Sequence, residues 1–391
     1  MNSPAASEPL HILIAACVPR RREGGVAATI YNLSRELEAR GHTISYLFMP
    51  DLVKPDSAGA RFHDSLFAIR LAEYISRNRN KFSVVNLHGP AGFVYGWRRA
   101  LSKGAGLPPY VLTLHGLEER RARVMKREAD KGRAWHFSLK NRLWHRLYQQ
   151  PRYSWSIRTA DAAHVHCRDT WTVLQLKYNL EPHRVAYIPH GVEERFFSER
   201  EYRDSADLKL LFPGTWLDQR GIFYLRDALK NLSQRLPGIK ITFAGTGVPD
   251  SVITQFFGPD LQKFLDVRPT VPSESMPALY AEHDALLFPS LLEGLPCVVM
   301  EAMASGMPVI TTETCGMADI VENNYNGLLV PPADGPAIEE AVARLAGSVE
   351  LRQRLGKAAQ QTMTRYTWKC SALKLENLFR TVIAAEGQYT K

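Results

Sequence analysis

Two glutamates in one short segment have the side chains needed to hold a polyol beside a phosphate. Glu293 and Glu301 lie eight residues apart, in the run Pro-Ser-Leu-Leu-Glu-Gly-Leu-Pro-Cys-Val-Val-Met-Glu-Ala of residues 289–302. Carboxylates accept hydrogen bonds from hydroxyl groups. Pro296 fits the first position of a helix, whose free amides and dipole favour a bound phosphate. Two solvated carboxylates in a strand-to-helix connection are the simpler alternative, but the Pro-Ser and Gly-x-Pro context favours a ligand site.

A second group of residues offers a cation and a close backbone approach to an anionic ligand. Arg220-Gly221 opens a predicted helix, after a strand that ends near Gly214 and Thr215. A guanidinium group can bind a phosphate through two parallel hydrogen bonds. Gly24-Gly25 ends a loop, and tandem glycines let the backbone approach a ligand closely. A surface charge and a simple turn are the alternatives for Arg220 and for the two glycines.

Histidines and cysteines give weaker signals. His115 follows an expected strand, where a single histidine is more often structural than catalytic, and His190 is interpreted as a structural turn residue. The five cysteines lie far apart without a Cys-x-x-Cys pair, which is typical of a reducing cytosol. No Asp-x-Asp follows a strand, and the loop glycines do not form Gly-x-Gly-x-x-Gly. We therefore predict neither a metal site nor a nicotinamide cofactor.

These residues lie in a repeated pattern of strand, glycine-rich loop and helix. The strands expected from short apolar runs are 11–17, 43–48, 82–88, 110–114, 185–188, 208–212, 239–243, 285–288, 308–312 and 327–330. Strands that alternate with one-sided apolar helices predict parallel sheets covered on both faces. Because the pattern restarts after the polar stretch 196–207, we predict two Rossmann-like α/β domains, with ligands at the carboxyl ends of their strands.

The segment around the two glutamates resembles the Glu-x7-Glu motif of the retaining glycosyltransferases of family 4, the group 1 glycosyltransferases. The resemblance covers nearly the whole chain. Thr-Leu-His-Gly around His115 is similar to the family's Thr-x-His-Gly, and Gly24-Gly25 to its Gly-Gly. The family usually has Lys where this chain has Arg220, and often Arg where it has Thr215. The other matching residues are Phe288-Pro289-Ser290, Ala302, Gly306, Pro308-Val309-Ile310, Gly316, Ile320-Val321 and 326–330.

The resemblance implies the GT-B fold, in which two Rossmann-like domains face each other across a cleft. Residues 1–200 would be the acceptor-binding domain, and residues 201–368 would bind a nucleotide-sugar donor. Residues 369–391 would form a C-terminal helix that packs back on the N-terminal domain.

The resemblance also implies the roles of individual residues. His115, Glu293 and Arg220 would be catalytic, and Glu301 would hold the ribose hydroxyls of the nucleotide. Glu293 and His115 would contact the donor sugar. The leaving phosphate would take the acceptor proton after front-face attack, with its charge met by Arg220, amides and helix dipoles. The predicted donor-binding residues are Gly24, Gly25, Gly214, Thr215, Arg220, Gly245, Glu293, Gly294, Leu295, Pro296, Glu301, Gly316 and Met317.

Charge is distributed unevenly along the chain. Residues 1–190 carry 29 basic and 15 acidic side chains, whereas residues 191–391 carry 20 and 25, so the first half suggests anionic partners. Residues 118–152 hold eleven Lys or Arg against four acids, interleaved with Trp, Phe, Tyr and Leu. This segment is either an interfacial helix on an anionic membrane or a solvated helix that packs on its own domain. No signature of nucleic-acid binding is present.

We therefore expect a retaining, metal-independent hexosyltransferase. Its substrates would be a nucleotide diphosphate sugar, such as UDP- or GDP-hexose, and a glycan or polyprenyl-linked acceptor, in bacterial cell-surface polysaccharide synthesis. No secretory signal or membrane span is recognised, so we expect a cytoplasmic protein, with peripheral attachment to the inner face of the membrane as an alternative. The rival functions are a non-catalytic GT-B binding protein and a GT-B nucleotide-sugar epimerase.

Overall fold

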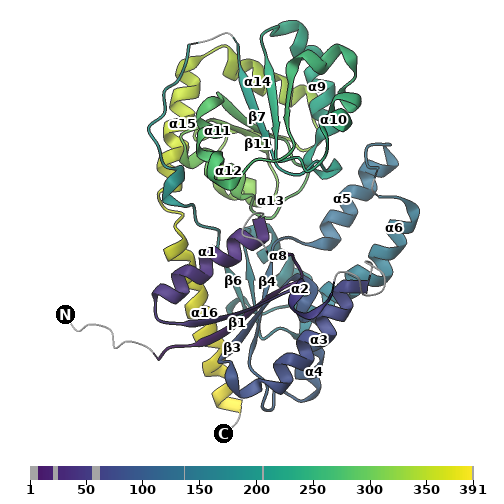
Figure 1. Cartoon of the computed structure of the whole chain (residues 1–391), viewed down its shortest axis with the longest axis vertical. Coiled ribbons are helices and arrows are strands. Elements are labelled where there is room, and N and C mark those ends of the chain that lie inside the picture. The colour runs from purple at the N-terminus through teal and green to yellow at the C-terminus, as the bar shows by residue number, and fades with distance from the viewer. Residues whose placement is uncertain (1–7, 21–24, 55–61, 136, 205–206, 390–391) are drawn as a thin grey trace, which may run out of the picture. The chain divides into compact units, whose positions relative to one another are not determined.

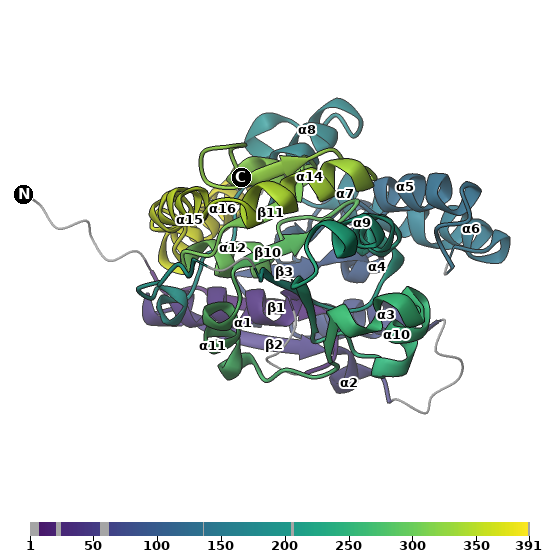
Figure 2. The ribbon, with the colours of Figure 1, turned by 90° about the horizontal axis from the view of Figure 1, so that it is seen from above.

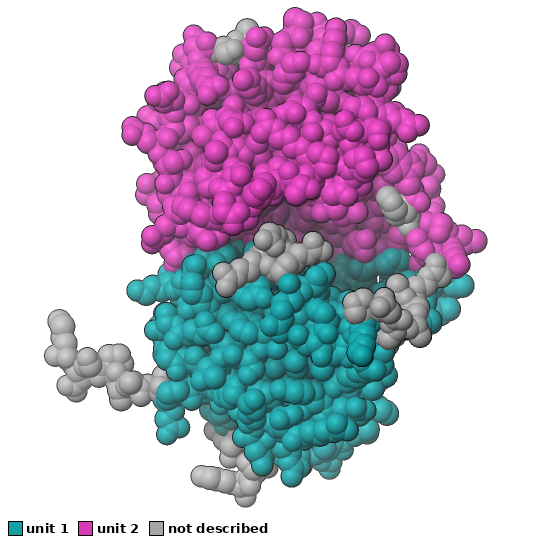
Figure 3. Space-filling view, viewed as in Figure 1, with its two compact units in different colours: residues 1–119, 143–191, 368–391 teal, residues 120–142, 192–367 magenta. Residues whose placement is uncertain are grey.

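The structure is a computed structural model that describes residues 8–20, 25–54, 62–135, 137–204 and 207–389. Its contacts divide the chain into two compact units, which Figure 3 colours separately. Unit 1 comprises residues 1–119, 143–191 and 368–391, and unit 2 comprises residues 120–142 and 192–367. Within the described residues, each unit has one six-stranded sheet whose neighbouring strands are all parallel (Figure 1). The prediction of two Rossmann-like α/β domains is confirmed.

The sheet of unit 1 has the strand order β2-β1-β3-β4-β5-β6. Its strands are β1 (His11–Ala16), β2 (Thr43–Phe48), β3 (Val84–His88), β4 (Tyr110–Leu114), β5 (Ala162–Val165) and β6 (Val185–Tyr187). Its helices are α1 (Gly25–Ala39), α2 (Met49–Leu52), α3 (His63–Arg77), α4 (Phe93–Leu101), α7 (Gln150–Thr159), α8 (Arg168–Leu176) and α16 (Trp368–Tyr389). Strand β5 was not predicted from the sequence.

Helices cover both faces of this sheet. Successive side chains of a strand point to opposite faces, so both sets of side chains are buried. In β1, Ile12 and Ile14 enter the core shared with α1 and α16, whereas Leu13 and Ala15 enter the core shared with α3, α4 and α7. A parallel strand with two covered faces reads as a continuous apolar run. This is why β1 could be recognised from its sequence alone.

The sheet of unit 2 has the strand order β12-β11-β10-β7-β8-β9. Its strands are β7 (Lys209–Pro213), β8 (Lys240–Ala244), β9 (Leu265–Arg268), β10 (Ala285–Phe288), β11 (Val309–Thr312) and β12 (Leu328–Val330). Its helices are α9 (Ile222–Arg235), α10 (Asp250–Phe257), α11 (Met276–Glu282), α12 (Cys297–Ala304), α13 (Cys315–Ile320), α14 (Gly335–Ala346) and α15 (Val349–Met363). Helices α9 and α14 lie side by side over one face of the sheet (Figures 1 and 2). Helices α12 and α15 pack against the core of the other face.

Residues 120–142 come from the first half of the sequence but belong to unit 2. They lie in α5 (Glu118–Asp130) and the first part of α6 (Leu139–Trp144). The buried Glu128 carboxylate accepts a hydrogen bond of 2.6 Å from the Tyr224 hydroxyl on α9. The Trp135 ring lies edge-on to the rings of Phe223 and Phe256, with centroids 4.9 and 5.1 Å away. Of the two alternatives for this segment, packing on its own N-terminal domain therefore does not hold for residues 120–142, because their apolar partners are on α9 and α10 of unit 2.

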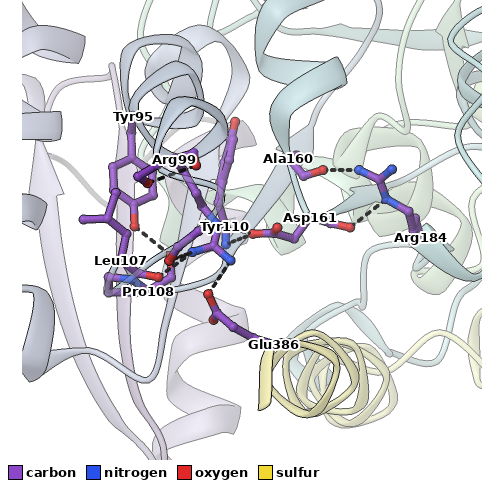
Figure 4. A network of polar contacts seen from close by, with 11 residues as sticks. Tyr95, Arg99, Leu107, Pro108, Tyr110, Ala160, Asp161, Arg184 and Glu386 are labelled. Carbon is purple, nitrogen blue, oxygen red and sulfur yellow. Dashed lines mark hydrogen bonds and ion pairs between the residues drawn. The ribbon is translucent and has the colours of Figure 1, made fainter. Parts of the chain in front are cut away.

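The C-terminal helix α16 packs on unit 1, as predicted. Its residues Leu375 and Phe379 are buried in the core that α1 shares. Figure 4 shows the polar contacts near its end, where the Arg99 guanidinium of α4 donates to Asp161 at 2.7 Å and to Glu386 of α16 at 2.6 Å. The helix is thus held by apolar burial and by an ion-pair network. No helix among the described residues is both long and apolar enough to cross a lipid bilayer.

Candidate functional site

The predicted site residues of unit 2 lie together where the order of the strands in its sheet reverses. The chain runs outward from β7 to β9 on one side of the sheet, and then from β10 to β12 on the other, so β7 and β10 are neighbours. In open α/β sheets, ligands bind outside the carboxyl ends of the strands at such a switch point. Gly214 follows β7, and Ser290 and Glu293 follow β10. The loops expected to bind a ligand are therefore adjacent.

Arg220 and Glu293 form an ion pair at this edge. The Arg220 Nη1 and Glu293 Oε1 atoms are 2.8 Å apart, and the two side chains are only 19% and 15% exposed. The Ser290 hydroxyl donates to the same carboxylate oxygen at 2.8 Å. The guanidinium lies over the Phe288 ring, with its carbon 4.8 Å from the ring centroid. A cation and a carboxylate are thus fixed side by side, largely withdrawn from water.

Gln219 and Gly221 hold the two loops together. The side-chain amide of Gln219 donates to the Leu292 carbonyl at 2.6 Å, and the backbone carbonyl of Gln219 accepts from the Leu291 N–H at 2.8 Å. Gly221 has φ +75°, and a Cβ there would lie 2.1 Å from the Pro289 carbonyl oxygen. Only glycine fits, because any side chain would be strained and would push the loops apart. The glycine after Arg220 therefore sets the position of the arginine.

Glu301 lies on α12 and is held by a tyrosine. The Tyr280 hydroxyl of α11 donates to Glu301 Oε2 at 2.8 Å. Burial raises the pKa of the Glu301 carboxyl to about 7, although the Tyr280 hydrogen bond and the charge of Arg195 act in the opposite direction. A carboxyl group whose pKa lies near neutral pH can ionise when a ligand binds, and its oxygens can then accept hydrogen bonds from the ligand's hydroxyl groups.

The remaining predicted donor residues of unit 2 are arranged in two crossing loops. The Gly316 amide donates to the Gly294 carbonyl at 2.8 Å, and a Cβ on Gly316 would lie 2.1 Å from that oxygen. Pro296 is the N-cap of α12 rather than its first helical residue, because its ψ of 118° is extended. Leu295 and Met317 have buried side chains in the core.

Three further predictions can be placed in unit 2. The Met317 amide donates to the Thr314 carbonyl at 3.2 Å, and its contact with a donor stays a prediction. Thr215 is exposed after β7. Gly245 follows β8 with φ +70° and open space around its Cα. Thr215 and Gly245 thus leave the carboxyl edge of β7 and β8 accessible.

In unit 1, His115 is part of a larger group of histidines. Its ring Nε2 lies 2.8 Å from Nδ1 of His88, and its ring stacks near those of His166 and His190, with centroids 5.0 and 6.4 Å away. Burial lowers the pKa of His115 to about 3, so the ring is neutral at physiological pH. Gly25 is the first residue of α1. Gly24 lies outside the described residues.

Sequence reasoning missed four residues of these sites. Tyr280, which positions Glu301, and Gln219, which joins the loops, carry no recognisable motif. His88 and His166 carry no motif either, because the histidines near them in space lie on other strands, far away in the sequence. The alternation Ala-His-Val-His in residues 163–166 is the signal that could have revealed a buried strand with two histidines.

Two family models match the chain. "Glycosyltransferase Family 4" matches residues 23–196, and "Glycosyl transferases group 1" matches residues 193–362. An uncharacterized glycosyltransferase of Methanocaldococcus jannaschii is 26% identical over 286 residues, which are 73% of this chain and 72% of the relative. A putative colanic acid biosynthesis glycosyltransferase of Escherichia coli, WcaL, is 26% identical over 204 residues, 49% of each chain.

A solved structure extends the likeness to the fold. Sucrose-phosphate synthase from Thermosynechococcus elongatus superposes with a TM-score of 0.76 at 19% identity, over 96% of this chain and all of that one. Together the two family models span residues 23–362, which include every strand of the two sheets except β1, and the Arg220–Glu293 pair. The chain therefore belongs to the group 1 glycosyltransferases of family 4, and it has the GT-B fold.

Proposed function

We propose that this glycosyltransferase transfers a hexose, with retention of configuration, from a nucleotide diphosphate sugar to a glycan or lipid-linked acceptor. The observation that carries the proposal is the Arg220–Glu293 pair at the carboxyl edge of β7 and β10. It supplies a cation for a diphosphate and a carboxylate for sugar hydroxyls within 3 Å of each other. The likeness to the putative colanic acid enzyme supports a role in bacterial cell-surface polysaccharide synthesis.

Donor binding rearranges this ion pair. A diphosphate takes Arg220 as its partner, because a guanidinium matches two phosphate oxygens at once. Glu293 is thereby released from Arg220 and accepts hydroxyl groups of the donor sugar. Glu301, held by Tyr280, accepts the ribose hydroxyls of the nucleotide. The neutral ring of His115 contacts the donor sugar.

The chemical step exchanges one bond at the anomeric carbon for another. The bond from the anomeric carbon to the leaving diphosphate oxygen breaks, and a bond to the acceptor oxygen forms on the same face. The acceptor proton passes to the leaving phosphate. Arg220 and nearby amides stabilise the negative charge that develops on that phosphate. Such electrostatic stabilisation is usually the largest single contribution to the rate acceleration by an active site. The only small molecules required are the donor and the acceptor, and no cofactor takes part.

The first experiment should identify the donor. We would incubate purified protein with UDP-, GDP- and ADP-linked hexoses, following the melting temperature and nucleotide release together, with Glu301→Ala as the control. A donor that stabilises the wild type but not the variant, with slow release of nucleotide, supports the transferase. Binding without release, in the presence of lipid-linked glycan acceptors, favours the non-catalytic protein, and conversion of the sugar to its epimer favours the epimerase.

Removing the Glu293 carboxylate is expected to separate binding from transfer. In Glu293→Gln, Arg220 no longer has a competing anion, so the free nucleoside diphosphate should bind several-fold more tightly. Transfer should fall by about 100-fold or more, because hydroxyl contacts that strengthen in the transition state are lost. Calorimetry gives the first value and a transfer assay the second. The exposed Glu340→Gln is the matched control, and weaker diphosphate binding in Glu293→Gln would contradict the exchange of partners.

The basic segment supports contact with an anionic membrane that carries the acceptor. Leu139, Leu143 and Leu147 follow one another at four-residue intervals and are all exposed, beside Lys140 and Arg146. Exposed apolar residues among basic ones are typical of interfacial helices. We expect the protein to sediment with vesicles containing phosphatidylglycerol but not with neutral vesicles. Leu143→Ser/Leu147→Ser should reduce this binding, and equal sedimentation of the variant would contradict the assignment. Such contact would place the enzyme on the cytoplasmic face of the membrane.

A further inference from the structure

Five histidines lie together at the carboxyl edge of the sheet of unit 1. They come from four adjacent strands: His88 ends β3, His115 follows β4, His164 and His166 come from β5 and its end, and His190 follows β6. All except His115 are at most 5% exposed. The ring centroids of His166 and His190 are 3.9 Å apart. Histidine is only intermediate in its tendency to be buried, so each of these ring nitrogens needs a hydrogen-bond partner or a ligand.

Hydrogen bonds determine which nitrogen of His115 carries its proton. The side-chain amide of Asn86 donates to the Val111 carbonyl at 3.1 Å, so the Asn86 oxygen faces His88 and accepts from its Nε2 at 3.2 Å. A neutral imidazole has one N–H and one lone pair, so His88, which donates from Nε2, carries its lone pair on Nδ1. That lone pair accepts from His115 Nε2 at 2.8 Å. His115 Nδ1 is therefore left with a lone pair.

The same reasoning applies to His166. A carbonyl can only accept, so the Ile188 carbonyl, 3.1 Å away, receives the proton of His166 Nδ1. His166 Nε2 then carries a lone pair, and it is buried without a hydrogen-bond partner among the described residues. His190 Nδ1 is likewise buried without such a partner in the part of the chain that the structure describes. A buried polar atom without a partner is costly, and these two ring nitrogens are free to take a ligand.

These three histidines converge on one point. One ring nitrogen each from His115, His166 and His190 lies within 4.8 Å of the other two. Zinc–imidazole bonds of about 2.0–2.1 Å place tetrahedral nitrogens about 3.4 Å apart, so small side-chain rotations would close the site. The second nitrogens of His115 and His166 are held by His88 and by the Ile188 carbonyl. Such outer partners are typical of histidines that bind metals.

We propose that His115, His166 and His190 bind a divalent transition-metal ion such as zinc, with a fourth position open. Three neutral imidazoles suit zinc, copper or nickel better than magnesium or calcium, which prefer oxygen ligands. The sequence offers no metal motif, because the three ligands follow three different strands. A metal held by His115 would engage the same ring that the proposed function assigns to the donor sugar. The ion would therefore inhibit transfer rather than take part in it.

Metal binding can be measured without any substrate, which keeps this test independent of the proposed function. Metal-free protein without a polyhistidine tag is titrated with Co²⁺ and, separately, with Zn²⁺ in a calorimeter. We expect one ion per chain and the visible absorption bands of tetrahedral Co²⁺. His166→Gln and His190→Asn should each weaken binding by more than about 100-fold, since loss of an outer partner alone costs about 10- to 100-fold.

Two comparisons make the outcome decisive. His183→Asn changes an exposed histidine of the same unit, and it should bind Co²⁺ as the wild type does. Denaturant unfolding of each variant separates loss of the site from loss of the fold. Absence of the tetrahedral bands in folded wild-type protein would overturn the proposal. Equal binding by wild type and by folded His166→Gln would also overturn it.

Discussion

Replacing Arg220 with methionine is expected to lower the kcat of sugar transfer by about 100- to 1,000-fold, the usual cost of removing one group that stabilises developing charge. Methionine keeps an apolar contact with the Phe288 ring but cannot neutralise the leaving diphosphate. Arg220→Lys should lose less, because it keeps the charge and loses only the two-point geometry. Steady-state kinetics with the donor that the panel of nucleotide sugars identifies would measure both variants.

The control for Arg220 must separate catalysis from folding. Arg220→Met leaves the Glu293 carboxylate without its cation in a largely buried place. The double variant Arg220→Met/Glu293→Gln removes that unpaired charge and should unfold at a denaturant concentration close to that of the wild type. Lys230→Met changes an exposed cation on α9, the helix that begins just after Arg220, and should keep full activity. A kcat for folded Arg220→Met within threefold of the wild type would assign charge stabilisation to another group.

Replacing Glu301 with glutamine is expected to weaken nucleotide binding and to strengthen the fold at alkaline pH. Hydrogen bonds to a charged group contribute about 1.5–3 kcal/mol each, so loss of the carboxylate should raise the Kd of the nucleotide about 10- to 100-fold. Because ligand hydroxyls favour the ionised carboxylate, the wild type should release protons when it binds nucleotide near pH 7. Calorimetry in two buffers of different ionisation enthalpy measures that release. Glu301→Gln should show none.

The stability effect follows from the direction of the pKa shift. Burial raises the pKa of Glu301 from its reference value of 4.5 to about 7. The folded chain therefore holds this proton more tightly than the unfolded chain, and the free energy of unfolding falls as the pH rises from about 4.5 to 7. Glu301→Gln abolishes this fall and should be more stable by about 1–3 kcal/mol at pH 8, with little difference at pH 4. A variant that is less stable than the wild type at pH 8 would contradict the shift.

The fold was readable from sequence wherever burial on both faces produced an uninterrupted apolar run. Strands β4 and β10, which are buried throughout, begin and end as predicted, and so does β2, although it is a partly exposed strand at the edge of its sheet. β5 was missed because His164 interrupts its apolar run, although that ring is buried and donates to the Ile188 carbonyl at 3.1 Å. β9 was missed because it lies at the edge of its sheet and alternates Leu and Val with Asp and Arg. In each case a tertiary contact, absent from the local pattern, satisfies the polar side chain.

The sites were predictable only where neighbours in space are also neighbours in sequence. Glu293, Gly294 and Pro296 could be grouped because a strand, a loop and a helix start follow directly on one another. Arg220 could be grouped with Glu293 only through the resemblance. Its ion pair with that carboxylate forms because two loops, whose paired residues are 73 positions apart in the sequence, meet at the switch point of the sheet. The histidine group shows the same limit, since its members become neighbours only when β3 to β6 align.

The insertion of residues 120–142 into unit 2 constrains how the two halves of such an enzyme can be recombined. The chain passes between the units at four places, after residues 119, 142, 191 and 367. A chimera that exchanges only residues 192–367 with those of a relative would leave Glu128 without Tyr224, and Trp135 without Phe223 and Phe256. A transplant of donor specificity therefore has to include residues 120–142 as well, because they belong to unit 2 although they are separated from the rest of it in the sequence.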